Sequence, residues 1–184
     1  MQNEPSHRSP TLDDETLAFA QRVFQHARAG HVQDLAELLD AGLPPNLMND
    51  KADTLLMLAS YHGHAEVARL LLERGADPER ANDRGQTPLA AAAYQGDMAM
   101  VLLLLERGAD VNGSGHNGRT ALMTAAMFNR VEIVDVLLAH GADLHARDAD
   151  GLTAEMAARI MGAADTPDQL ARAAARAAGE RHST

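Results

Sequence analysis

The chain has 184 residues, a formal net charge of −10 and no cysteine. The lack of cysteine excludes disulfides, thiolate metal sites and a cysteine nucleophile, and the acid excess disfavours nucleic acid, whose binding requires cations that neutralise phosphates. Apolar residues make up 46% of the chain but aromatic residues only 3%. The expected core is therefore built from Ala, Leu, Val and Met, which suits short, closely packed helices.

Residues 1–10 are polar and lack the basic start and apolar run of a secretory signal. No stretch approaches the ~20 apolar residues of a membrane span. We therefore expect a disordered tail over 1–10 and a cytoplasmic protein with no membrane partner. Only Lys51 among the sixteen basic residues is a lysine, a bias typical of GC-rich bacterial coding sequence.

The first predicted helix begins at Thr11 and ends at Gly30, with three acidic residues in its first turn. One apolar stripe runs along it at Leu17, Ala20, Phe24 and Ala27. A second helix is predicted from Val32 to Asp40, and two prolines at 44 and 45 then mark a turn.

The chain repeats with a period of 33 residues, beginning within these first two helices. Three sets of positions keep the interval: Gly42, Gly75, Gly108 and Gly141; Gly30, Gly63, Gly96, Asn129 and Gly162; and Thr54, Thr87, Thr120 and Thr153. Each Thr is predicted to cap an inner helix that is rich in small residues. An outer helix follows, and a glycine able to adopt the left-handed conformation ends it.

Two outer-helix positions are apolar in the later units but acidic in the first. They read Asp34, Val67, Met100, Ile133 and Glu37, Leu70, Leu103, Val136. If they face the preceding repeat, the first unit has no neighbour there. We therefore expect Asp34 and Glu37 to be exposed and the first unit to be a cap.

The last unit departs from the pattern after Gly162. Thr166 and Gln169 predict a capping box, with Pro167 at the first helical position and Gly179 ending the helix. Its apolar stripe is Leu170, Ala173, Ala174 and Ala177. Five helix pairs result, of which three are full repeats and two are caps.

A 33-residue unit containing the segment Thr87-Pro88-Leu89 resembles the ankyrin repeat, and the resemblance covers about residues 20–178. It implies an all-α ankyrin-repeat solenoid of five stacked helix-loop-helix units with projecting hairpin loops. The implied boundaries are one domain over 11–179, repeats at about 13–45, 46–81, 82–114, 115–147 and 148–179, and a frayed tail over 180–184.

In that family the partners are usually proteins, held by hairpin tips and by inner-helix positions on the concave face. Carried over, the partner-binding tip residues are Asp50, Lys51, Asp53, Asp83, Arg84, Gln86, His116, Asn117, Arg119 and Asp150. The inner-helix residues are Tyr61, His62, Tyr94, Gln95, Met127 and Phe128. The resemblance predicts a non-catalytic, monomeric protein-binding scaffold without a cofactor, and the acid excess suits a partner with a basic surface.

Packing roles compete with this interpretation at several positions. Tyr61, Tyr94 and Met127 could close the seam between inner and outer helices rather than contact a partner. The family places a histidine after its Thr-Pro-Leu segment, and this chain has Met57, Ala90, Met123 and Met156 there. We expect these residues to fill the core, the alternative being an adaptable binding groove.

Two other functions stay open. One is an inhibitory subunit of the immunity-protein or antitoxin type, which would cap a basic enzyme or toxin. The other is a cryptic metal-dependent enzyme that uses His116 or His62. The His62-Gly63-His64 segment lacks a carboxylate or cysteine at ligand spacing, so no catalytic, cofactor or metal residue is predicted.

Overall fold

The computed structural model describes residues 12–180, which form ten helices and no strands. The inner helices are α1 (Leu12–Ala29), α3 (Leu55–His62), α5 (Pro88–Gln95), α7 (Ala121–Met127) and α9 (Ala154–Met161). The outer helices are α2 (Val32–Asp40), α4 (Ala65–Glu73), α6 (Met98–Glu106), α8 (Val131–Ala139) and α10 (Thr166–Glu180). None of these helices combines the length and apolar character needed to cross a bilayer.

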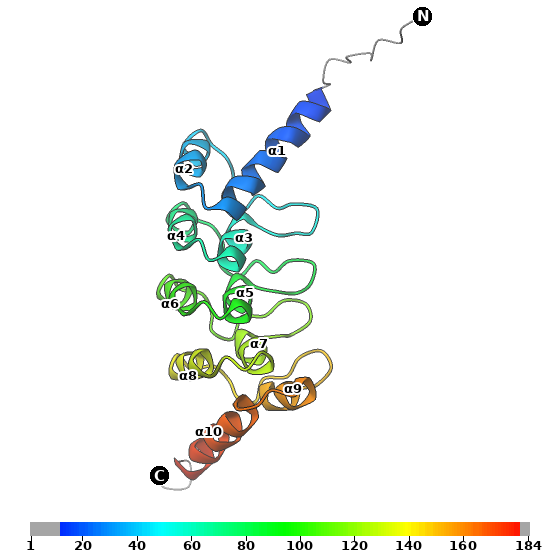
Figure 1. The fold of residues 1–184 in the computed structure, drawn as a ribbon, viewed down its shortest axis with the longest axis vertical. Coiled ribbons are helices and arrows are strands. Elements are labelled where there is room, and N and C mark those ends of the chain that lie inside the picture. The colour runs from blue at the N-terminus through cyan, green and yellow to red at the C-terminus, as the bar shows by residue number, and fades with distance from the viewer. Residues whose placement is uncertain (1–11, 181–184) are drawn as a thin grey trace, which may run out of the picture.

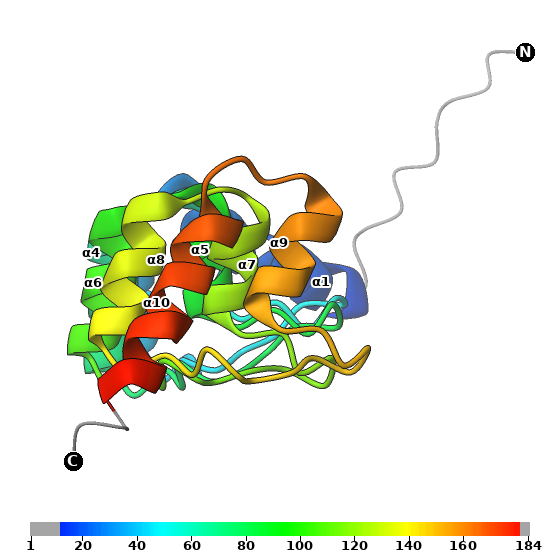
Figure 2. The same ribbon diagram turned by 90° about the horizontal axis from the view of Figure 1, so that it is seen from below.

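The helices stack as five antiparallel pairs in two columns (Figure 1). Hairpin loops between successive pairs project from the inner column, on the side away from the outer helices, and Figure 2 shows them gathered along one edge of the stack. The predicted all-α solenoid of five helix pairs is confirmed. The predicted tail over 1–10 lies outside the described residues.

The repeated threonines cap the inner helices as predicted. The hydroxyl oxygens of Thr54, Thr87, Thr120 and Thr153 accept a hydrogen bond from the backbone N–H three residues later, at 3.0, 3.2, 3.3 and 3.4 Å. Gly63 and Gly96 end their helices in the left-handed conformation, with φ of 75° and 79°. Asn129 takes the same conformation in the next repeat, with φ of 54°.

The outer column buries its apolar face against the preceding repeat. Val67 and Met100 are fully buried and Ile133 is 3% exposed. Asp34 holds this position in the first unit, and Glu37 holds the position of Leu70, Leu103 and Val136. Both acids are exposed, as predicted. Repeat stacks need such a polar end because their last face has no neighbour.

The N-terminal helix is buried only in its second half. Phe24 and Ala27 pack into the core, whereas Leu17 is 59% exposed. The first turns of α1 extend beyond the rest of the stack (Figure 1). The predicted apolar stripe is therefore buried only in the second half of α1, because none of the described helices covers Leu17.

The last helix docks on the stack in a way that differs from the prediction. The Thr166 hydroxyl donates to the Ala126 carbonyl at 2.6 Å, and Nε2 of Gln169 donates to the Val131 carbonyl at 3.0 Å. Both side chains bind the preceding repeat, so the predicted capping box does not form. The helix also continues through Gly179 to Glu180.

Methionine and alanine fill the core where the resemblance would place a histidine. Met57, Ala90 and Met123 are between 1% and 2% exposed, which confirms that they are core residues. The expectation is wrong for Met156, which is 44% exposed, because none of the described residues forms a further repeat on its unit.

Candidate partner-binding face

A row of aromatic side chains runs across three successive inner helices. The rings of Tyr61 in α3 and Tyr94 in α5 stack with centroids 6.0 Å apart, and Phe128, directly after α7, meets Tyr94 edge-on at 4.6 Å. Both tyrosines are half-buried and Phe128 is 38% exposed. The rings therefore tie the inner helices together and still present apolar surface to the outside.

A hollow of about 230 Å³ lies beside the end of this row. Tyr94, Met127 and Phe128 form its apolar wall, while Arg84 and Arg119 come from two neighbouring hairpin tips. Among the described residues that line it there is no carboxylate. The hollow thus has an apolar wall and two arginines at its edge, although the chain as a whole carries a net negative charge.

A second hollow, of about 320 Å³, lies next to Tyr61 and also borders Arg84. His62 lines it, and the pKa of His62 is lowered by partial burial and by the nearby His64 and Arg28. His64 itself is held in place, because its Nε2 donates to the Arg28 carbonyl at 2.7 Å.

The hairpin tips are joined into a continuous row by hydrogen bonds between repeats. The Asp83 N–H donates to the Lys51 carbonyl at 3.1 Å, and Nδ2 of Asn117 donates to the Arg84 carbonyl at 2.8 Å. The Ala149 N–H then donates to the Asn117 carbonyl at 2.9 Å. These bonds fix the spacing of the tip side chains along the stack.

Most predicted tip and helix residues lie on this face with accessible side chains. Exposed side chains belong to Asp50, Lys51, His62, Asp83, Arg84, Gln95, His116 and Asp150, and half-buried ones to Gln86, Asn117, Arg119 and Met127.

Asp53 is the exception among the predicted contact residues. It is 6% exposed, and its carboxylate accepts hydrogen bonds from Asn82 at 2.8 Å and Asn49 at 3.2 Å. Its carboxylate therefore holds two hairpins together.

Polar residues that shape the hairpins were not recognised from the sequence. Oδ1 of Asn82 accepts the N–H groups of Arg84 and Gln86, at 3.0 and 3.1 Å. Asn49 and Asp148 do the same in their own loops. The 33-residue interval from Asn49 to Asn82 was the signal that could have revealed this role.

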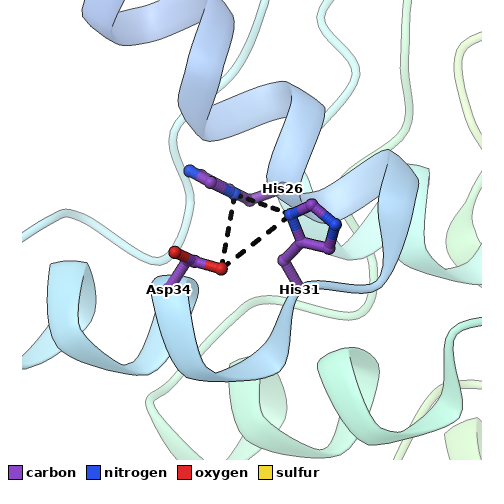
Figure 3. A group of neighbouring side chains, drawn as sticks. All are labelled: His26, His31 and Asp34. Atoms are coloured by element: carbon purple, nitrogen blue, oxygen red, sulfur yellow. Dashed lines mark hydrogen bonds and ion pairs between the residues drawn. The ribbon is translucent and has the colours of Figure 1, made fainter.

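A second feature that could not be found from the sequence lies in the first helix pair. His26, His31 and Asp34 bring their side chains together at the junction of α1 and α2 (Figure 3). The His62 and His64 rings, weighed in the sequence as a metal pair, stack at 6.3 Å and belong to no such three-residue group among the described residues.

The helix pairs, capped by threonine and joined by projecting hairpins, define a repeat solenoid. Models of ankyrin repeats match residues 23–115 (three copies) and residues 104–154 (many copies). The chain therefore belongs to the ankyrin-repeat family, which generally mediates protein–protein interaction without catalysis.

A Pseudomonas aeruginosa protein named as an ankyrin repeat protein is 59% identical over 54 residues. That match covers 29% of this chain and 32% of the relative, so the chain spans about a third of the length of the curated relative it matches. The likeness supports the repeat itself rather than any activity of the whole relative.

Proposed function

We propose that the protein binds a partner protein through its inner-helix face and hairpin tips, with the aromatic row as the centre of the contact. The observation that carries this proposal is the exposed edge of the row beside a hollow with an apolar wall. Tyr, Phe and Met are enriched at the cores of protein interfaces. A few such residues usually supply most of the binding energy.

The charges around the hollow favour a particular kind of partner group. Arg84 and Arg119 border it and no described lining residue is acidic, so an apolar side chain next to a carboxylate fits best. Arg119 lies 3.8 Å from the buried Asp148, which limits its movement. A basic surface on the partner would instead meet the acidic groups elsewhere on the chain, since the net charge is −10.

The test compares two variants of equal exposure on opposite columns of the stack. Phe128 is 38% exposed next to the inner helices and Leu102 is 37% exposed on the outer helix α6. We expect Phe128→Ala to weaken partner binding by more than ~2 kcal/mol and Leu102→Ala to leave it unchanged. Affinity capture from the organism's own lysate, quantified by mass spectrometry, identifies the partner and compares wild type with both variants.

Equal stability of the two variants in thermal unfolding would show that a loss of capture reflects a loss of contact. The proposal is wrong if the set of captured proteins is the same for wild type and Phe128→Ala, or if Leu102→Ala alone removes a protein from it.

A further inference from the structure

Three side chains with metal-ligating atoms meet in the N-terminal cap. Nδ1 of His26 lies 3.1 Å from Nδ1 of His31, and each of these nitrogens lies 3.8 Å from Oδ2 of Asp34 (Figure 3). His26 comes from the last turn of α1, His31 is the residue that precedes α2, and Asp34 lies in the first turn of α2. The described residues contain no other group of three or more such ligands.

The separations match those of ligands around one ion. Zn²⁺ takes imidazole nitrogen at ~2.0–2.1 Å and carboxylate oxygen at ~2.0–2.2 Å in tetrahedral geometry, which puts neighbouring ligand atoms ~3.4 Å apart. The observed 3.1 and 3.8 Å lie on either side of that value. Side-chain movements of a few tenths of an ångström would complete the geometry.

The backbone holds the two histidines close without help from an ion. The His31 N–H donates to the His26 carbonyl at 3.0 Å across the turn at Gly30. Gly30 has φ of 76°, and a Cβ on it would lie 2.6 Å from Nδ1 of His64, so the next repeat packs tightly against this turn. The ligands therefore extend from a fixed part of the chain, as a metal site requires.

The three side chains contact one another, and a bound ion would replace these contacts. His31 makes no side-chain hydrogen bond to the start of α2, the place where a capping residue would make one. The side chains of His31 and Asp34 are 52% and 58% exposed and that of His26 is 25% exposed. One side of the group thus faces solvent, where water can supply a further ligand.

We propose that the N-terminal cap binds a divalent transition-metal ion through Nδ1 of His26, Nδ1 of His31 and Oδ2 of Asp34, with water completing the coordination. Imidazole and carboxylate together suit Zn²⁺ better than Mg²⁺ or Ca²⁺, which prefer oxygen ligands. The ion joins α1 to α2 in the first unit, which has one neighbouring repeat among the described residues. Binding therefore stabilises the exposed end of the stack.

The experiment uses the full chain without an affinity tag, treated with chelator and then titrated with ZnCl₂ in a calorimeter. We expect one ion per chain. His31→Gln and Asp34→Asn each change an exposed ligand and should weaken binding by more than the roughly 10- to 100-fold that losing an outer-shell partner costs. His145→Gln, an exposed histidine in a loop, is the matched control and should bind as wild type does.

A second readout is thermal unfolding with and without zinc, together with the visible spectrum of the Co²⁺ form. At zinc ~100-fold above Kd, Tm should rise by about 5–10 °C in wild type and the control, and by much less in the ligand variants. Circular dichroism of each variant reports whether it is folded.

Absence of saturable binding by folded wild type would overturn the proposal. So would binding that survives in the double variant His26→Gln/His31→Gln, because the ion would then be held elsewhere. The proposal would also be overturned if His145→Gln lost as much zinc affinity as His31→Gln.

Discussion

At the scale of single residues, the 33-residue interval allows the same position to be compared in successive repeats. Ser60 is fully buried, and its hydroxyl has no hydrogen-bond partner in the described structure. The corresponding residues of the neighbouring repeats are Ala27, Ala93 and Ala126, all fully buried. A buried polar group without a hydrogen-bond partner lowers the free energy of unfolding by ~1–3 kcal/mol. Serine at position 60 is therefore less stabilising than the alanine found in these other repeats.

We expect Ser60→Ala to raise the free energy of unfolding by about 1 kcal/mol, because it removes the unpaired hydroxyl and matches the other repeats. Urea denaturation of the two proteins measures the difference. The reverse change, Ala93→Ser, places a hydroxyl in the equivalent site and should lower stability. A less stable Ser60→Ala protein would show that the hydroxyl has a partner or a function.

At the scale of elements, the hairpin loops depend on close approach between neighbours. A Cβ on Gly115 would lie 2.5 Å from the carbonyl oxygen of Gly85 in the preceding hairpin, so the two backbones nearly touch. A Cβ on Gly113, in the same loop, would come closest to Oε2 of Glu79, the end of a flexible side chain.

Gly115→Ala should therefore destabilise the protein by about 1–3 kcal/mol, since two backbones must move apart. Gly113→Ala is the matched control and should cost less, because its closest contact is the end of a side chain. Moving Glu79 costs its hydrogen bond from the exposed Asp110 N–H, and the Asp110 carbonyl, 3.0 Å from the added Cβ, must shift slightly. Thermal or urea unfolding compares the two, and hydrogen exchange at residues 82–86 would locate the change in the hairpin. Equal costs would mean that backbone contact between the loops contributes little.

The sequence predicted the elements where the repeat applied and failed where it ended. Helix pairs, threonine caps and the exposed Asp34 and Glu37 follow from positions that recur in every unit. The docking of Thr166 and Gln169 on the preceding repeat could not be predicted, because the sequence of α10 does not follow the pattern of the earlier outer helices.

The candidate site was predicted in the same uneven way. The aromatic row lies at recurring inner-helix positions, so its members could be identified from the 33-residue period. The burial of Asp53 depends on contacts between two loops, which the period does not reveal. The His26, His31 and Asp34 group joins two helices across the turn at Gly30. The same turn recurs in later repeats, but none of them places two histidines and a carboxylate at these three positions. The spacing of the group in sequence, five residues and then three, matches no single helical face and gave no signal.

At the scale of the whole molecule, the contribution of a residue depends on whether another repeat covers it. Met123 and Met156 hold the same position in adjacent units, yet one is 1% exposed and the other 44% exposed. Ile160 and Met161, also in α9, are 69% and 51% exposed. The α9 end of the inner column therefore presents apolar side chains that no described residue covers, whereas α2, at the other end of the stack, exposes acidic ones.

The same substitution at these two methionines should have very different effects. Met123→Ala removes a buried side chain between two repeats and should cost about 2–5 kcal/mol, whereas Met156→Ala removes a half-solvated side chain and should cost less than ~1 kcal/mol. Urea denaturation measures both, and the helical content of each variant is checked first by circular dichroism. Repeat units interact only with their neighbours, so the difference between the two stability losses reflects the interface that Met123 has with a following repeat and Met156 lacks. Similar costs would mean that Met156 is covered in solution, either by a second copy of the chain or by chain outside residues 12–180. A denaturation midpoint that depends on protein concentration would indicate the second copy.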